Sequence, residues 1–98
     1  MQTYILLTKF SPDLCQKMKD QEVIGRTWFD QVREKCPSVK FIAHYALLGQ
    51  FDFLDIYEAP DEETAAKVSL ISQVNGAFQA QSLPAIQYKK FLKLVKEI

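Results

Sequence analysis

The fold of this chain is decided by residues 47–65, which read LLGQFDFLDIYEAPDEETA. The segment from Phe51 to Ala59 is short and rich in aromatic and aliphatic residues, which is typical of a strand. A two-residue turn at Gly49-Gln50 joins it to a preceding strand, and glycine at the first turn position suits type II′ geometry. Pro60 and three acidic residues then begin a helix, where negative charge interacts favourably with the helix dipole. The stretch therefore predicts a β-hairpin followed directly by a helix.

Outside this stretch, the remaining elements extend the pattern in both directions. Ser11 is a good N-cap with Pro12 at the first helical position, and Pro37 ends the helix that follows. Gly76 is a natural residue to follow the end of the second helix. The expected elements are, in order, strand 3–9, helix 12–36, strand 39–48, strand 51–59, helix 61–75, strand 77–83 and helix 86–98.

The order strand-helix-strand-strand-helix-strand predicts a ferredoxin-like α+β fold. In that fold one four-stranded antiparallel sheet carries both helices on one face, because right-handed crossovers place them on the same side. A chain of 98 residues is expected to form one small domain, so residues 1–98 are expected to be a single domain with residues 86–98 as a C-terminal helix.

The hairpin register determines which side chains share a face of the sheet. If Leu48 pairs with Phe51, then His44 lies directly opposite Asp55. The more aliphatic face, expected to pack against the helices, then carries Val39, Phe41, Ala43, Tyr45, Leu47, Asp52, Leu54, Ile56 and Glu58. The opposite face carries Lys40, Ile42, His44, Ala46, Leu48, Phe51, Phe53, Asp55 and Tyr57. That second face is too apolar to remain in water, so a second copy of the chain is its expected cover.

Composition excludes several classes of partner. The 12 basic and 12 acidic side chains give no net charge to attract phosphate, so no nucleic acid partner is expected. An RNA-binding module has the same order of elements and uses aromatics spaced like Phe51 and Phe53, but Asp52 and Asp55 would repel phosphate. The apolar run at residues 4–7 is too short for a signal peptide or a membrane span, so no membrane partner is expected.

The cysteines and the single histidine argue against a metal or a disulfide. They supply no set of zinc ligands, and no phosphate-binding loop is present, so no cofactor is expected. In a continuous helix, Cys15 and Cys36 would lie roughly 30 Å apart at about 1.5 Å per residue. A disulfide needs Cα atoms about 4.4–6.8 Å apart, so the thiols are expected to be free, as in a reducing, cytoplasmic compartment.

The order and spacing of these motifs resemble the GYD-domain family. The turn Gly49-Gln50-Phe51-Asp52 and the following Glu58-Ala59-Pro60-Asp61 look like that family's hallmark, with Phe51 in place of the motif tyrosine. Residues 3–7 and 76–83 look like its first and last strands. The family is similar in fold to the dimeric α/β-barrel superfamily, so the resemblance implies a homodimer with paired sheets. Those relatives include cofactor-free monooxygenases, lactone isomerases, haem enzymes and small regulatory binding domains, so fold does not fix function.

Five residues are candidates for a ligand site: Tyr4, His44, Phe53, Asp55 and Tyr57. The pair of His44 and Asp55 either supports acid–base chemistry or is a satisfied polar pair at an interface. Tyr4 either adds a phenol to the same cavity or packs as a core aromatic. We expect a homodimer with a cavity for a small apolar or aromatic molecule. The alternative is a cofactor-independent oxygenase or isomerase that uses His44, Asp55 and Tyr4.

Overall fold

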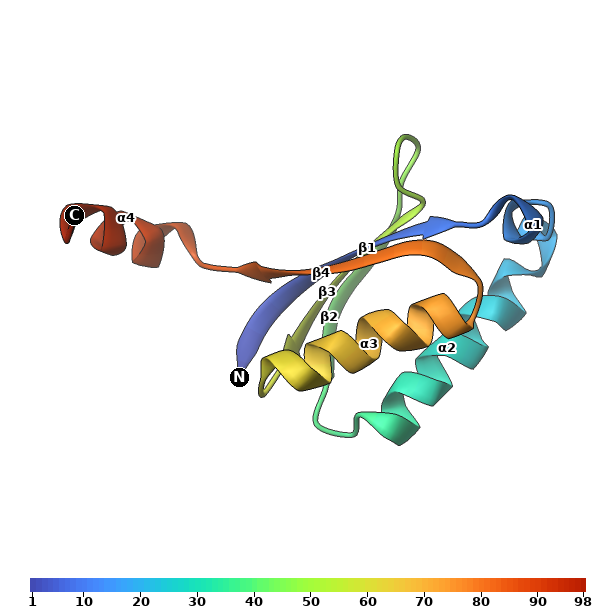
Figure 1. Ribbon diagram of the computed structural model, residues 1–98, viewed down its shortest axis with the longest axis horizontal. Coiled ribbons are helices and arrows are strands. Elements are labelled where there is room, and N and C mark those ends of the chain that lie inside the picture. The colour runs from blue at the N-terminus through green and yellow to red at the C-terminus, as the bar shows by residue number, and fades with distance from the viewer.

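The computed structural model describes residues 1–13 and 15–98, and it has the predicted α+β architecture (Figure 1). One antiparallel sheet contains the strands β1 (Gln2–Phe10), β2 (Lys40–Ala46), β3 (Phe53–Ala59) and β4 (Ala77–Ala85). Their order in the sheet is β2-β3-β1-β4, which confirms the ferredoxin-like prediction. The helices α2 (Gln21–Lys35) and α3 (Glu62–Val74) lie on the same side of the sheet (Figure 1). A last helix, α4 (Tyr88–Lys96), follows β4.

The predicted helix over residues 12–36 is broken into three pieces. A short α1 (Pro12–Cys15) is followed by the 3-10 helix η1 (Met18–Asp20) and then by α2. Residues 16–20 are polar apart from Met18, which is itself exposed. This segment therefore has no apolar stripe that burial can hold in a continuous α-helix.

The edge position of β4 explains why this strand continues through Pro84, where the sequence predicts its end. Pro84 pairs with Tyr4 of the neighbouring strand β1. Proline cannot donate a backbone hydrogen bond, but an edge strand tolerates it on the side that has no neighbour. The strand therefore continues to Ala85.

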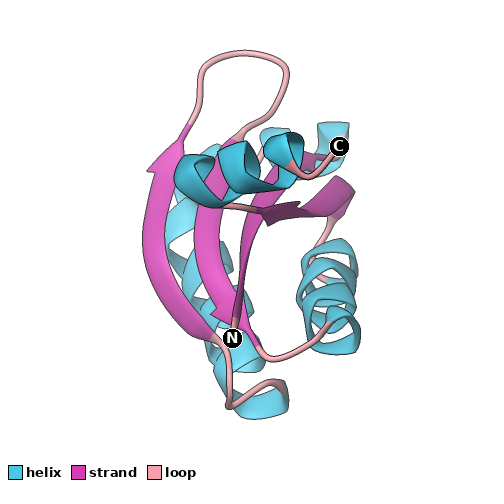
Figure 2. Ribbon diagram, turned by 90° about the vertical axis from the view of Figure 1, so that its left-hand side faces the viewer, coloured by secondary structure: helices cyan, strands magenta, loops and turns pink.

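The β2–β3 hairpin has the predicted register beside its loop but not the predicted turn. His44 pairs with Asp55 and Ala46 with Phe53, as expected. Residues 47–52, however, form a wide loop that stands out from the end of the sheet (Figures 1 and 2). Type II′ geometry requires a positive φ at Gly49, and among the described residues only Gly76, with φ 102°, has one.

Backbone and side-chain bonds of Asp52 hold this wider loop. The Asp52 N–H donates to the Thr8 carbonyl at 2.8 Å, and the Leu47 N–H donates to the Asp52 carbonyl at 2.8 Å. The Asp52 carboxylate also accepts the Phe10 N–H at 2.7 Å. The loop is therefore anchored to β1 rather than closed by a tight turn.

The helix-covered face of the sheet is the one that the sequence predicts to be open. Tyr57 is fully buried and packs in the core with Val32 of α2 and Val68 of α3. A register shift between Phe41 and Ala43 brings Phe41 to the same side, where its ring contacts that of Tyr57. The prediction was wrong because alternation says which residues share a face but not which face the helices cover.

The opposite face, here called the open sheet face, is apolar and has no helix packed on it. It carries Ile5, Leu7, Ala43, Tyr45, Leu54, Ile56 and Leu83. Tyr45 is 59% exposed and Leu83 is also exposed. A contiguous apolar surface of this kind marks an interaction site more often than a monomer surface.

No helix in the described ranges, 1–13 and 15–98, combines the length and the apolar character needed to cross a membrane.

Candidate functional site

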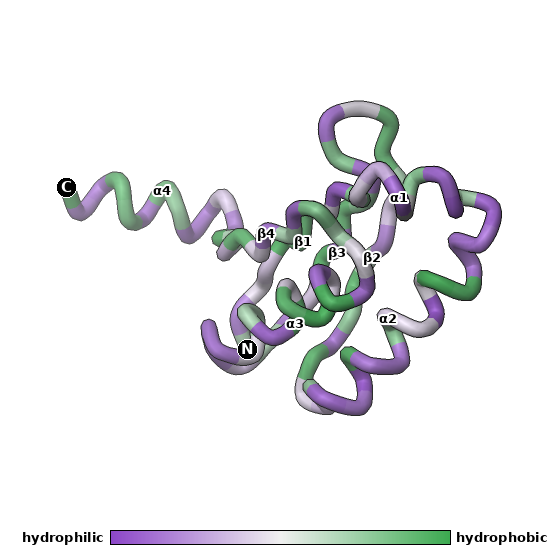
Figure 3. Tube along the Cα trace, turned by 45° about the vertical axis from the view of Figure 1, so that its right-hand side comes forward, coloured by the Kyte–Doolittle hydropathy of each residue, from purple (hydrophilic) through white to green (hydrophobic). Residues whose placement is uncertain are grey.

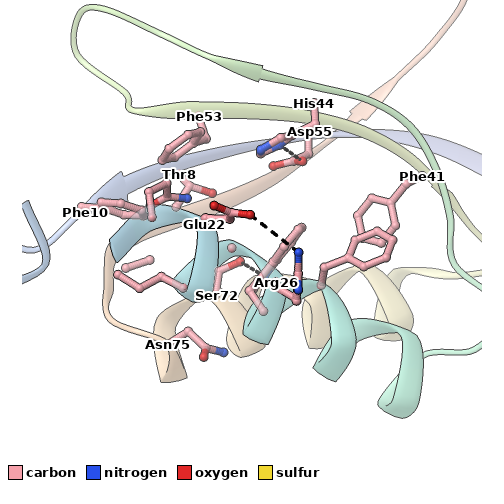
Figure 4. A pocket seen from close by; sticks show the side chains of 16 residues that line it. Thr8, Phe10, Glu22, Arg26, Phe41, His44, Phe53, Asp55, Ser72 and Asn75 are labelled. Carbon is pink, nitrogen blue, oxygen red and sulfur yellow. Dashed lines mark hydrogen bonds and ion pairs between the residues drawn. The ribbon is translucent and has the colours of Figure 1, made fainter. Parts of the chain in front are cut away.

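A cavity of about 450 Å³ lies between α2 and the helix-covered face of the sheet. Most of its wall is apolar or aromatic and consists of Phe10, Ile24, Gly25, Trp28, Phe29, Phe41, Phe53 and Ala77. The polar side chains that line it are Thr8, Gln21, Glu22, Arg26, His44, Asp55, Ser72 and Asn75. Glu22 and Arg26 form an exposed ion pair of 3.8 Å at the cavity's α2 side (Figure 4). The volume and the lining are those of a site for a small molecule.

Gly25 keeps one wall of this cavity free of a side chain. A glycine inside a helix costs about 1 kcal/mol relative to alanine, so its presence in the middle of α2 needs a reason. A Cβ placed on Gly25 would lie 3.3 Å from Nε2 of Gln21, and a larger side chain would extend into the cavity. Gly25 therefore leaves room in the cavity but lowers the stability of α2.

The His44–Asp55 pair lies in the sheet-side wall of the cavity (Figure 4). Nδ1 of His44 is in direct hydrogen-bond contact with Oδ1 of Asp55, and the two residues come from the paired strands β2 and β3. Asp55 is only 3% exposed, whereas the His44 side chain is 58% exposed. The His44 ring also stacks on Phe53, with centroids 5.5 Å apart and planes 10° apart. The contacts fix the ring and leave Nε2 for a ligand or water.

The charge state of His44 decides what the pair can do. The hydrogen bond to Asp55 raises the pKa of His44 above its ordinary value; partial burial opposes this effect, and the charge of Asp55 adds to it. The protonated ring donates from Nε2 to an acceptor on a ligand, and the neutral ring accepts a proton there. The raised pKa extends the donor form to higher pH than in an ordinary histidine.

Tyr4 and Tyr57 lie outside the cavity wall, in the core. Their rings stack with centroids 5.6 Å apart, and both residues are buried. The Tyr57 hydroxyl donates to Ser82 Oγ at 2.7 Å, and burial raises the pKa of Tyr57 to about 12. Of the five sequence candidates, the structure brings His44, Phe53 and Asp55 together in the cavity wall.

Sequence reasoning missed the contribution of α2. Trp28 Nε1–H donates to Ser72 Oγ of α3 at 2.7 Å, which fixes the indole at the cavity. Oε1 of Gln21 is buried and has no hydrogen-bond partner among the described residues. A signal was present in the sequence, because the sole tryptophan follows Gly25 by three residues and so shares its side of the helix.

The described residues contain no group of three or more histidine, cysteine, aspartate or glutamate side chains placed to hold a metal ion. Cys15 and Cys36 are free thiols, the first exposed and the second buried.

Comparisons with known proteins give a family match and a relative that each cover nearly all of the chain. Residues 4–95 match the family described as the GYD domain. A relative from Thermus thermophilus, named glutamine synthetase and cystathionine beta-lyase binding protein, is 30% identical over 97 residues, which cover 98% of this chain and 100% of the relative. No solved structure matches the chain.

Proposed function

This chain belongs to the GYD domain family, and from that premise we propose that it is a homodimeric binding protein whose cavity holds a small apolar or aromatic molecule. The observation that carries the proposal is the cavity of about 450 Å³ between α2 and the sheet. Protein interiors are normally close-packed, so a space of this size lined by aromatic rings is a site for a ligand. Gly25 supports this reading because it keeps the space open.

The polar groups of the wall indicate the features of the ligand. Protonated His44 offers Nε2–H to an acceptor, because Asp55 holds the other ring nitrogen. The rings of Trp28, Phe41 and Phe53 provide apolar surface around this group. The expected ligand therefore has an aromatic or apolar body and one hydrogen-bond acceptor.

Fluorescence of Trp28 tests the cavity directly, because it is the only tryptophan and it lines the cavity. The aromatic anion anilinonaphthalene sulfonate is the probe, and its binding is expected to quench Trp28 by energy transfer. Gly25→Leu fills the cavity and is expected to abolish this quenching. The control Val23→Leu places the same side chain at an exposed position of α2 and is expected to leave it unchanged. Equal quenching in wild type and Gly25→Leu would overturn the proposal.

The homodimer part of the proposal rests on the open sheet face. Its apolar side chains face away from both α2 and α3, and Tyr45 at its β2 edge is more than half exposed. A second copy of the chain is the proposed cover of this face, in a closed dimer with two-fold symmetry.

Binding of a protein partner is the second candidate function, and the name of the Thermus thermophilus relative supports it. The relative matches over its full length, so no additional domain of its own accounts for its binding. Light scattering tests whether this chain binds the same enzymes. The chain is mixed with purified glutamine synthetase in one sample and with cystathionine beta-lyase in another. The mass of a complex is expected with either enzyme. If only the masses of the separate proteins are found, this function is excluded for those two enzymes.

A further inference from the structure

The helix α4 has no partner surface within its own chain. Every residue from Ile86 to Ile98 is exposed, including Tyr88 at 71% and Phe91 at 48%. Tyr88, Phe91, Leu92 and Val95 follow the spacing of one helix face and form what is here called the α4 stripe. The helix projects beyond the end of the sheet, and apolar and polar residues alternate along it (Figures 1 and 3). An isolated helix of nine residues is not stable in water, so its apolar face needs a partner.

The connection to β4 keeps α4 away from its own domain. Only Ile86 and Gln87 separate Ala85, the last residue of β4, from Tyr88, the first of α4. Gln87 is extended, with φ −57° and ψ 140°, so the chain continues off the end of the sheet. In the structure α4 therefore projects past the end of the sheet and does not turn back onto the open sheet face of the same chain (Figure 1).

The exposed surface is large enough for a stable interface. A folded monomer of 11.3 kDa exposes about 5,700 Å² by size scaling, whereas this chain exposes 7127 Å². The excess of about 1,400 Å² exceeds the roughly 800 Å² that each partner contributes to a standard interface. The radius of gyration of 14.6 Å likewise exceeds the roughly 12.6 Å expected for 98 residues. Both values are larger than a folded monomer of this size has, as expected for a chain whose surface is partly covered by a partner.

Charge favours another copy of the chain as the partner. Residues 88–98 hold four lysines against Glu97, a net charge of +3. Residues 1–87 then hold eight basic and eleven acidic side chains, a net charge of −3. Four of those acids lie at residues 58–63, at the end of β3 next to the sheet: Glu58, Asp61, Glu62 and Glu63. The basic arm and the acidic domain of this sequence are therefore complementary.

We propose that α4 is an exchanged arm: in the dimer, the α4 stripe of each chain packs on the open sheet face of the other. Lys89 and Lys96, which flank the stripe, then face the acidic segment 58–63 of the second copy. This inference rests on the homodimer proposed above and adds the element that holds it together. It also explains why the chain has two unpartnered apolar surfaces, since each covers the other across the interface.

Spin labelling locates the arm. A nitroxide is placed at Lys93→Cys in a Cys15→Ser background, in which the remaining thiol, Cys36, is buried. The labelled chain is mixed with unlabelled ¹⁵N chain, so broadening of ¹⁵N amide signals reports contact between copies. We expect broadening at Ile5, Leu54 and Ile56 of the open sheet face. The control label at Lys19→Cys, in η1 at the opposite end of the molecule, is expected to leave these three signals unchanged (Figure 1).

The possible results test the arm exchange independently of dimerisation. A dimer by light scattering without broadening at the open sheet face overturns the arm exchange and leaves the dimer intact. A monomer overturns both proposals. A matched pair of variants gives an independent measure: Phe91→Ala in the stripe is expected to raise the dimer dissociation constant at least tenfold. Lys90→Ala on the opposite side of α4 is expected to change this dissociation constant less than twofold. Equal dissociation constants for the two variants would overturn the arm exchange.

Discussion

At the scale of single residues, the contact between His44 and Asp55 carries the chemistry of the site. Asp55 is buried and His44 is the group that meets solvent and the cavity. A buried carboxylate needs a partner, and the imidazole supplies both a donor and, when protonated, a compensating charge. The same contact therefore serves the structure and prepares Nε2 of His44 for a ligand.

Replacing Asp55 by asparagine is expected to lower the pKa of His44. The hydrogen bond that His44 donates to Asp55 is the largest cause of the raised pKa, and asparagine has no charge to favour the imidazolium. NMR titration of His44, the only histidine, measures the change in one signal. Asp52→Asn alters a carboxylate bonded to Phe10 instead and is the control. Equal pKa values in wild type and Asp55→Asn would show that the pair does not govern the ring.

The same pair predicts a pH dependence of stability. The folded-state pKa of His44 is raised, so proton binding favours the folded chain. This contribution is complete below the unfolded pKa, about 6.5, and is lost as the pH rises through the folded pKa. Because the ring is more than half exposed, solvent screening keeps the effect small. Melting temperatures across this window are expected to fall in wild type and not in Asp55→Asn; parallel curves would contradict the linkage.

The Tyr57 hydroxyl is expected to contribute to stability rather than to binding. It donates to Ser82 Oγ at 2.7 Å, and Ser82 Oγ in turn lies 2.6 Å from Ser69 Oγ. Tyr57→Phe removes one buried hydrogen bond but leaves the serine pair, so we expect a loss of about 1 kcal/mol. Urea unfolding measures this loss. Anilinonaphthalene sulfonate binding is expected to be unchanged, and a loss of binding would place Tyr57 in the site.

At the scale of secondary-structure elements, local signals were predictive and tertiary ones were not. The pairing of His44 with Asp55 follows from the sequence around the hairpin, because a hairpin is a local structure. The break before α2 was missed because Pro12 and Pro37 mark the outer limits of a helical segment but not whether it is continuous. The α2 wall of the cavity was missed because Gly25 reads as a weak helix residue until α2 is placed against the sheet.

The Asp52 carboxylate is expected to hold the β2–β3 loop to β1. Asp52→Ala leaves the Phe10 N–H without its acceptor at the end of β1, at a cost of about 1–3 kcal/mol. The substitution is expected to increase hydrogen exchange at Phe10 and at the loop amides, while the core of β1 stays protected. An unchanged exchange rate at Phe10 would show that the backbone bonds of the loop suffice.

At the scale of the whole molecule, both faces of the sheet are apolar, and this is why the sequence did not distinguish them. The helix-covered face is aromatic and holds a polar pair, because Trp28 and Phe29 of α2 meet it with rings of their own. The open sheet face is aliphatic, with Ile5 and Ile56 at its centre. Strands that are apolar on both sides indicate a sheet that is covered on both faces. The helices of one chain cover only one of these faces.

Light scattering at micromolar concentration is therefore expected to give the mass of a dimer. Leu54→Asp on the open sheet face is expected to give a folded monomer, because dimerisation would bury an unpaired charge. Leu70→Asp makes the same change at an exposed position of α3, on the other side of the molecule, and is expected to remain a dimer. Phe53, which the sequence assigned to the interface, lies in the cavity wall, so Phe53→Asp is expected to disturb the cavity rather than the interface. A wild-type monomer, or a Leu54→Asp dimer as tight as wild type, would exclude the open sheet face as the interface.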